Sequence, residues 1–314
     1  MLGFFIVLLA SFFFCFQNVI VRVLFTEHAF LGLFPLGGFV TPTLPHSFLL
    51  LAMRMLLVVP LMSILASRFY PPTWKELASL AQPPQRGILL QSIAGGGLMF
   101  LYLALLYLSV GMIPTGIAMT LFFTYPVFTA LFSWGWFGDR PTRLQWGVMG
   151  IVLLGSALTM PHPSAVAPGY NWIGVTTGIA SGVAYAFYTV VAQKSFTDLH
   201  PVPYTWVSFA TTLVLSCLCL PFGQSQETLP WVALWIGGLC SAIVTFAGHV
   251  LTNIGIRLIG ATTAAMIGTA NPAFTVVLAW GAIQETLKGG QLMGVAIVTV
   301  GVVLLSRDRS LKKP

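Results

Sequence analysis

Charged residues are scarce in this 314-residue chain: only 7% of its residues are Asp, Glu, Lys or Arg, whereas 57% are hydrophobic. A soluble domain carries about 25% charged residues, which keep its surface in contact with water. The composition therefore excludes an ordinary water-soluble protein and indicates a chain that lies in lipid. Lys and Arg outnumber Asp and Glu by 14 to 7, but they are spread thinly between apolar runs. No dense basic patch for nucleic acid is formed, so we expect no nucleic-acid partner.

The sequence also has few cysteines and lacks catalytic signatures. Cys15, Cys217, Cys219 and Cys240 all lie inside apolar runs and have no CxxC spacing, so we interpret them as small packing residues. HExxH, GxSxG and phosphate-binding P-loop motifs are absent, and the five histidines are scattered. We therefore expect no enzyme activity, no metal and no cofactor. A polytopic membrane enzyme is the alternative that these absences disfavour.

Long apolar runs, separated by prolines and charged residues, predict an all-α integral membrane protein with ten transmembrane helices. A bilayer core about 30 Å thick requires roughly 20 apolar residues of helix. The first run has no basic n-region and continues to about Phe25, so it is interpreted as a span and not as a signal peptide. The predicted spans cover residues 2–25, 47–67, 88–109, 113–137, 144–160, 172–194, 203–222, 230–256, 260–282 and 288–306.

The positions of Lys and Arg predict the orientation of these spans. If the N-terminus is cytoplasmic, the inner loops and the C-terminal tail hold every Lys and Arg except Lys288 in an outer loop and Arg22 and Arg54 within spans. Loops rich in Lys and Arg stay on the cytoplasmic side of a membrane. We therefore predict a multi-pass protein of the plasma (inner) membrane with both termini in the cytoplasm.

Two stretches 146 residues apart share one pattern. "TYPVFTALFSWGWFGD" (124–139) and "ANPAFTVVLAWGAIQE" (270–285) match at Pro, Phe, Thr, Trp, Gly and a closing acid. Each copy would hold five spans, and an odd number forces the second copy to cross the membrane in the opposite direction. Asp139 is thus predicted at the inner surface and Glu285 at the outer one. Two inverted five-helix repeats are a common architecture of secondary transporters.

This repeat predicts the division of the chain. Four segments are expected: a first five-helix repeat over residues 1–160, a linker over 161–171, a second, inverted repeat over 172–306, and a basic cytoplasmic tail over 307–314. A membrane scaffold or receptor without transport activity is a further alternative, but it gives no reason for an inverted repeat.

Both copies resemble the closing unit of the EamA family, in the drug/metabolite transporter superfamily. That unit has a proline in one span, an acid at its end, a glutamine six residues later and glycines in the next span. Gln145 and Gln291 hold the glutamine position in the two copies, and Gly155 and Gly301 hold the late glycine.

The resemblance extends over nearly the whole chain. "AYAFYTVVAQK" (184–194) is similar to the family's first span of the second half, and "CFQNVIVR" (15–22) is a looser match in the first half. Asp139 replaces the usual Glu, and the outer loop 26–46 is longer than the family usually carries. The resemblance implies a secondary transporter that exports small organic solutes such as amino acids. It also implies a cavity between spans 1, 3, 4, 6, 8 and 9, with spans 5 and 10 at the periphery.

Polar side chains inside the predicted spans are the candidates for a substrate cavity, because such groups are costly in lipid and are often functional. Tyrosines suit mixed polar and apolar solutes, although they are also common in helix packing. The candidate cavity residues are Gln17, Asn18, Arg54, Tyr102, Tyr125, Tyr185, Tyr188, His249, Asn253 and Asn271. Pro126 and Pro272, about midway along their spans, are candidate hinges or gates, with packing kinks as the alternative.

Two of these candidates raise specific questions. His249 and Asn253 stand one helical turn apart and share a face. All seven acids map to loops or span ends, so either His249 couples proton movement or the protein is a facilitator or exchanger. A hydrogen-bonded structural histidine is the alternative. Arg54 could attract the carboxylate of a substrate or anchor a backbone carbonyl. The expected partners are a small-molecule solute and the lipid bilayer, and a homodimer stays open.

Overall fold

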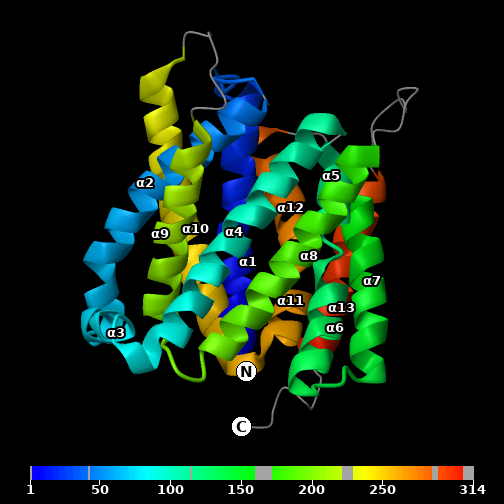
Figure 1. Ribbon diagram of the computed structural model, residues 1–314. Coiled ribbons are helices and arrows are strands. Elements are labelled where there is room, and N and C mark those ends of the chain that lie inside the picture. The colour runs from blue at the N-terminus through cyan, green and yellow to red at the C-terminus, as the bar shows by residue number, and fades with distance from the viewer. Residues whose placement is uncertain are drawn as a thin grey trace.

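The computed structural model describes residues 2–41, 43–113, 115–159, 172–220, 229–284 and 289–306 (Figure 1). The predicted linker over 161–171, the predicted tail over 307–314 and Glu285 lie outside these residues. Almost all described residues belong to helices whose axes run along one common direction (Figure 1). The helices are α1 (Leu2–Phe25), α2 (Leu44–Phe69), α3 (Thr73–Leu80), the short 3₁₀ helix η1 (Pro83–Gln85), α4 (Arg86–Met112), α5 (Thr115–Phe122), α6 (Tyr125–Phe137), α7 (Arg143–Thr159), α8 (Trp172–Ser195), α9 (Pro201–Cys219), α10 (Trp231–Ile259), α11 (Ala261–Gly268), α12 (Asn271–Ile283) and α13 (Gly289–Ser306).

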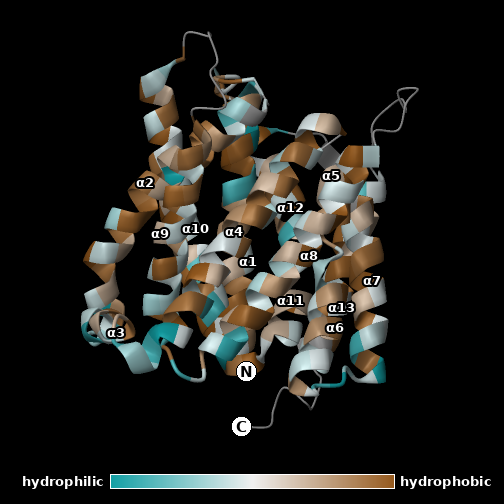
Figure 2. Ribbon diagram, viewed as in Figure 1, coloured by the Kyte–Doolittle hydropathy of each residue, from teal (hydrophilic) through white to brown (hydrophobic). Residues whose placement is uncertain are grey.

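Eight helical segments in the described part of the chain are long and apolar enough to cross a membrane. The predicted fifth and tenth spans correspond to α7 and α13, whose apolar parts, Arg143–Leu158 and Gly289–Leu304, are shorter. Many large apolar side chains are exposed on the outside of the bundle, and hydrophobic residues extend along most of its helices (Figure 2). A surface of this kind is suited to lipid and not to water. The structure is therefore a mostly helical, multi-pass membrane fold.

The cysteines show how far packing could be inferred from apolar runs. Cys15 is fully buried, as predicted, but Cys217 and Cys240 are exposed on the surface of the bundle, and all four thiols are free. The packing interpretation is therefore wrong for Cys217 and Cys240. Periodicity alone did not separate the lipid-facing side of α9 and α10 from their protein-facing side, because both sides are apolar.

The fourth and ninth predicted spans are each broken into two helices. Pro126 and Pro272 are the second residues of α6 and α12, a place where the missing N–H of proline is tolerated. Tight turns join the halves: Thr124 N donates to Leu121 O at 3.2 Å, and Ala270 N donates to Ile267 O at 3.0 Å. The sequence predicts a kink at each proline. The structure has a complete break instead, because each proline starts a new helix.

The helices pack in matching pairs. α1 contacts α10 and α12, whereas α8 contacts α4 and α6; α2 packs on α9, and α7 packs on α13. Glycines allow α7 and α13 to approach closely, as small residues do between membrane helices. A Cβ on Gly155 would lie closer than 3.0 Å to Val298, and a Cβ on Gly301 would lie closer than 3.0 Å to Val152.

The predicted long loop over 26–46 contains an unforeseen hairpin. Strands β1 (His28–Phe30) and β2 (Phe34–Leu36) pair antiparallel, with Phe30 opposite Phe34. Leu31 and Gly32 both have positive φ, at 51° and 71°, and such angles suit a hairpin turn. Leu31 N donates to Ala282 O at 2.8 Å, so the hairpin is fixed to the end of α12.

At the opposite end, the residues around α3 connect α2 to α9. The Tyr70 ring stacks on His200, with centroids 3.8 Å apart and planes inclined by 10°. Tyr70 Oη donates to Glu76 Oε1 at 2.5 Å. Burial, together with the nearby charge of Arg257, lowers the pKa of His200, which keeps the stacked imidazole neutral near pH 7.

Candidate functional site

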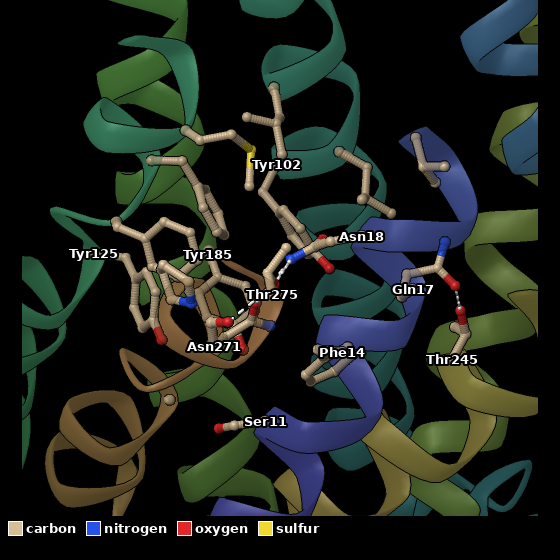
Figure 3. Close-up of a pocket in the computed structure, with 18 of the residues that line it drawn as sticks. Ser11, Phe14, Gln17, Asn18, Tyr102, Tyr125, Tyr185, Thr245, Asn271 and Thr275 are labelled. Atoms are coloured by element: carbon tan, nitrogen blue, oxygen red, sulfur yellow. Dashed lines mark hydrogen bonds between the residues drawn. The ribbon is translucent and has the colours of Figure 1, made fainter. Parts of the chain in front are cut away.

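A cavity of about 540 Å³ lies inside the bundle (Figure 3). Its lining comes from α1, α4, α5, α6, α8, α10, α11 and α12, together with Ser47 and Arg54 of α2 and with Thr26 and His28 at the start of the hairpin. Among the described residues, α7, α9 and α13 contribute nothing to the lining. The arrangement agrees with the cavity that the family resemblance implied, and adds the second span to it through Arg54.

Both helix breaks face this cavity. Phe123 and Tyr125 line it at the break between α5 and α6, and Gly268 and Asn271 line it at the break between α11 and α12. Tyr125 Oη donates to Ala265 O at 3.2 Å, so the first break is bonded to the second broken helix. Irregular backbone inside a membrane bundle is tolerated where it lines a cavity, and solute sites of transporters are typically built there.

A hydrogen-bonded group joins α1 to the start of α12 (Figure 3). Asn18 Nδ2 donates to Asn271 Oδ1 at 2.7 Å and lies 3.0 Å from Thr275 Oγ1, which also accepts from it. Thr275 Oγ1 in turn donates to the backbone oxygen of Asn271 at 2.9 Å. These three side chains present amide and hydroxyl groups to the cavity just beyond the break.

Arg54 forms a second polar group with Gln17 and Tyr107. Its Nη2 donates to Tyr107 Oη at 3.3 Å. The Gln17 amide, oriented so that both of its ends are satisfied, accepts from Arg54 Nη1 at 2.8 Å and donates to Ser241 Oγ at 2.8 Å and Thr245 Oγ1 at 3.0 Å. Arg54 is only 6% exposed, and its Nε has no hydrogen-bond partner. A guanidinium that uses only two of its five N–H donors in these bonds therefore lines the cavity.

Aromatic rings form one wall of the cavity (Figure 3). Tyr185 meets Tyr102 with ring centroids 4.9 Å apart and Tyr125 with centroids 4.7 Å apart, both edge to face. Phe122 lies against the same three tyrosines. No hydrogen bond of the Tyr102 or Tyr185 hydroxyl is found among the described residues, and both side chains line the cavity. These hydroxyls can therefore donate to a ligand.

His249 also lines the cavity and is only 4% exposed. Its ring meets Phe14 edge to face at 5.0 Å and Phe209 at 5.6 Å. Nδ1 is buried without a hydrogen-bond partner. The hydrogen-bonded interhelical histidine considered from the sequence is thus replaced by a histidine held mainly by aromatic contacts.

Three of the residues selected from the sequence do not line the cavity: Tyr188, Asn253 and Pro126. Asn253 Nδ2 donates to Tyr188 Oη at 3.0 Å and to Thr205 Oγ1 at 2.8 Å, and all three side chains are completely buried. They bind α8, α9 and α10 together. The shared helical face of His249 and Asn253 did not predict this, since the two side chains meet different neighbours along α10.

The structure brings the other selected residues to one cavity. These are Gln17, Asn18, Arg54, Tyr102, Tyr125, Tyr185, His249, Asn271 and Pro272. The sequence did not select Tyr107, Thr245 or Thr275. Two of these had a signal: Thr275 lies one turn after Asn271 and belongs to the repeated pattern, and Thr245 lies one turn before His249.

In the described part of the chain, no three His, Cys, Asp or Glu side chains gather closely enough to hold a metal ion.

Comparisons with known proteins agree on one family. The family model for the EamA-like transporter family matches residues 33–160 and, a second time, residues 172–307. The uncharacterized transporter sll1319 of Synechocystis is 56% identical over 310 residues, 98% of this chain and 94% of that protein. The threonine/homoserine exporter RhtA of Escherichia coli K12 is 25% identical over 248 residues, 77% of this chain and 78% of that protein.

A crystal structure whose description gives no function has a similar fold, with a TM-score of 0.73. It is 19% identical, and the match covers 96% of this chain and 94% of the other. This likeness supports the helical arrangement and carries no functional information.

Proposed function

The chain belongs to the EamA-like transporter family, and we propose that it is a secondary transporter of small organic solutes, such as amino acids or related metabolites. The observation that carries this proposal is a cavity of about 540 Å³ inside an apolar bundle, which is lined by residues of both helix breaks and holds several polar side chains, among them Arg54, Asn18 and Asn271. The exporter RhtA among the relatives supports movement out of the cytoplasm.

We further propose that ten spans form two inverted five-helix repeats, with α7 and α13 as the fifth and tenth spans. The two family matches support a duplication. Figure 1 supports the inversion, since α5 and α6 run downward whereas α11 and α12 run upward. The contacts of α7 and α13 support it as well. The repeat offset of 146 residues relates Gly155 to Gly301 and Val152 to Val298. The contact of Gly155 with Val298 therefore has an equivalent in the contact of Gly301 with Val152.

The packing pairs support the same two-fold relation. In the proposed repeats α1 corresponds to α8, and α4 corresponds to α10. The contact of α1 with α10 therefore has a counterpart in the contact of α8 with α4. The contact of α1 with α12 likewise becomes that of α8 with α6. Two halves related in this way can adopt each other's conformation, which opens the cavity alternately to the two sides. Pro126 and Pro272, at the breaks, are the proposed hinges.

The proposed orientation places the lower end of Figure 1 in the cytoplasm. The first residues of α1, α4 and α7 lie at that end, and so do the last residues of α2, α6, α8 and α10. The Lys and Arg residues of these junctions therefore gather on one side, as the positive-inside rule requires. The α3 segment lies at the same end, and the β-hairpin lies at the opposite, proposed outer end (Figure 1).

The transport proposal is tested by counterflow in proteoliposomes. Metabolite profiling of medium from overexpressing cells identifies the solutes whose export rises, and these are then supplied in labelled form. A carrier gives transient accumulation of the labelled solute in vesicles preloaded with unlabelled solute. Conversion of the solute to a new chemical species would instead indicate a membrane enzyme, and absence of any flux would indicate a scaffold or receptor.

We expect that transport does not depend on proton binding by His249. Aromatic rings pack around the imidazole, and among the described residues no acid that could continue a proton relay lines the cavity. His249→Gln should therefore leave the pH profile of the initial transport rate unchanged between about pH 6 and pH 8, where histidine ordinarily titrates. Loss of a pH-dependent limb in this variant would show that His249 couples protons to transport.

A further inference from the structure

The described lining of the cavity has cationic groups and no anionic group. Arg54 and Arg22 contribute to it, whereas none of its described residues is Asp or Glu. Arg54 is the most deeply enclosed of the permanent charges, at 6% exposure. Among the described residues it forms no ion pair, and its recorded partners, Gln17 and Tyr107, are neutral. Arg54 is therefore a fixed positive charge without an anionic partner among the described residues.

The neutral partners accept hydrogen bonds from only some of the N–H donors of the Arg54 guanidinium. Nη1 and Nη2 each donate one hydrogen bond to them, and Nε donates none. An uncompensated charge inside a membrane protein is costly. A carboxylate accepts two parallel hydrogen bonds from a guanidinium and neutralises its charge. The free hydroxyls of Tyr102 and Tyr185 line the same cavity and can donate to further anionic oxygens.

The same cavity has little to offer an ammonium group. Asn271 Oδ1 already accepts from Asn18 Nδ2 at 2.7 Å. Aromatic faces can attract a cation, but the tyrosine rings meet one another edge to face, which covers part of those faces. The carboxylate of a zwitterion would pair with Arg54. Its ammonium group would lose its hydration, and no charged partner among the described lining residues would compensate for that loss.

We propose that the cavity selects a monoanionic organic acid, whose carboxylate pairs with Arg54, over a zwitterionic amino acid of the same shape. This assignment rests on the proposed function, because it takes the cavity as the solute site. It narrows the solutes to carboxylates with one net negative charge and an apolar or aromatic body that fits against the tyrosine wall. A carrier of such a solute moves charge, so its rate responds to the membrane potential.

Three probes with one shared phenyl body test the proposal: 3-phenyllactate, L-phenylalanine and 2-phenylethylamine. They carry a net negative charge, no net charge and a net positive charge, respectively, near neutral pH. Binding is measured by calorimetry on the full-length protein in lipid nanodiscs, where leakage of the acid across a bilayer has no influence. We expect 3-phenyllactate to bind at least about tenfold more tightly than L-phenylalanine, and the amine not to bind.

Variants at Arg54 distinguish the effect of its charge on ligand selectivity from an effect on folding. Arg54→Gln should remove the preference for the anion, whereas Arg54→Lys, which keeps the charge, should retain it. Tyr107→Phe is the matched control, because it deletes the hydroxyl that accepts from Nη2 and leaves the charge in place. If Arg54→Gln fails to fold, the preference of the wild-type protein for 3-phenyllactate over L-phenylalanine still tests the proposal without any variant. An equal loss of affinity for all ligands in a folded Arg54→Gln protein would reveal a purely structural arginine and overturn the proposal.

The outcomes also separate this inference from the transport proposal. L-phenylalanine binding as tightly as 3-phenyllactate, or binding of none of the three probes, would overturn the anion assignment. Selective binding of 3-phenyllactate without counterflow in proteoliposomes would leave the anion site standing and contradict the carrier. With both proposals correct, net efflux of 3-phenyllactate from loaded vesicles moves one negative charge per solute, and its rate changes when a potassium diffusion potential is imposed with valinomycin.

Discussion

Replacing Asn271 with leucine is expected to reduce transport by about tenfold or more, the effect of losing roughly 1.4 kcal/mol of solute binding or of hinge stabilisation. Asn271 Oδ1 accepts from Asn18 Nδ2 at 2.7 Å, and the Asn271 backbone oxygen accepts from Thr275 Oγ1 at 2.9 Å. The substitution deletes the acceptor through which the first turn of α12 binds Asn18 of α1. Because the group borders the cavity, water can satisfy the remaining polar atoms, and the unfolding temperature should change little.

Asn253→Leu is the matched control, since it makes the same chemical change outside the cavity. Asn253 is completely buried and bonded to Tyr188 and Thr205. Removing it leaves two buried hydroxyls with fewer partners, which should destabilise the fold by about 1–3 kcal/mol. The solute affinity of the protein that remains folded should be unchanged. Initial transport rates per folded protein and thermal unfolding in detergent distinguish the two variants. The opposite pattern would contradict this assignment of the two asparagines.

Gly301→Leu is expected to separate α7 from α13 and to lower stability by about 1–3 kcal/mol, the usual cost of overpacking. Even a Cβ at this position would lie closer than 3.0 Å to Val152, on the facing helix. Gly155→Leu should have an effect of similar size, because Gly155 holds the corresponding position against Val298. Similar losses at both sites are the signature of the proposed two-fold relation between the halves.

Gly150→Leu is the control for both glycine variants. Gly150 lies on α7, its backbone is exposed, and no atom lies within 4 Å of a Cβ built there. The unfolding temperature of this variant, followed by tryptophan fluorescence in detergent, should match that of the parent protein. If Gly150→Leu destabilises the protein as much as Gly301→Leu, leucine itself is harmful in α7, and the close contact with α13 is not the cause.

Much of this architecture could be predicted because apolar runs and prolines have direct structural meaning in a membrane. The predicted spans fall on α1, α2, α4, α8, α9 and α10 to within a few residues. Breaks at Pro126 and Pro272 were foreseen only as kinks, since a proline in an apolar run does not show whether it interrupts one helix or starts another. The hairpin over 28–36 could not be predicted, because its position depends on a bond between Leu31 and Ala282, 251 positions apart in the sequence.

The candidate site was predictable to the extent that polar residues in lipid are rare. Arg54, Gln17 and Asn271 stood out for that reason, and the structure places them around one cavity. Tyr107 was missed because nothing in the sequence separates it from the many tyrosines that pack between helices. Tyr188 and Asn253 were selected by the same polarity rule, yet they satisfy each other away from the cavity. Polarity in a span indicates that a partner exists, and only the fold shows whether the partner is protein or solute.

Side-specific labelling of Asp139→Cys and Glu285→Cys tests the inverted repeat most directly. Each cysteine is introduced singly, with Cys15, Cys217, Cys219 and Cys240 replaced by alanine, and intact cells are treated with a membrane-impermeant maleimide. We predict that the cysteine at 285 is labelled from outside, whereas that at 139 is labelled only after the membrane is permeabilised. Labelling of both positions from the same side of the membrane would contradict the inverted repeat and the alternating carrier that depends on it.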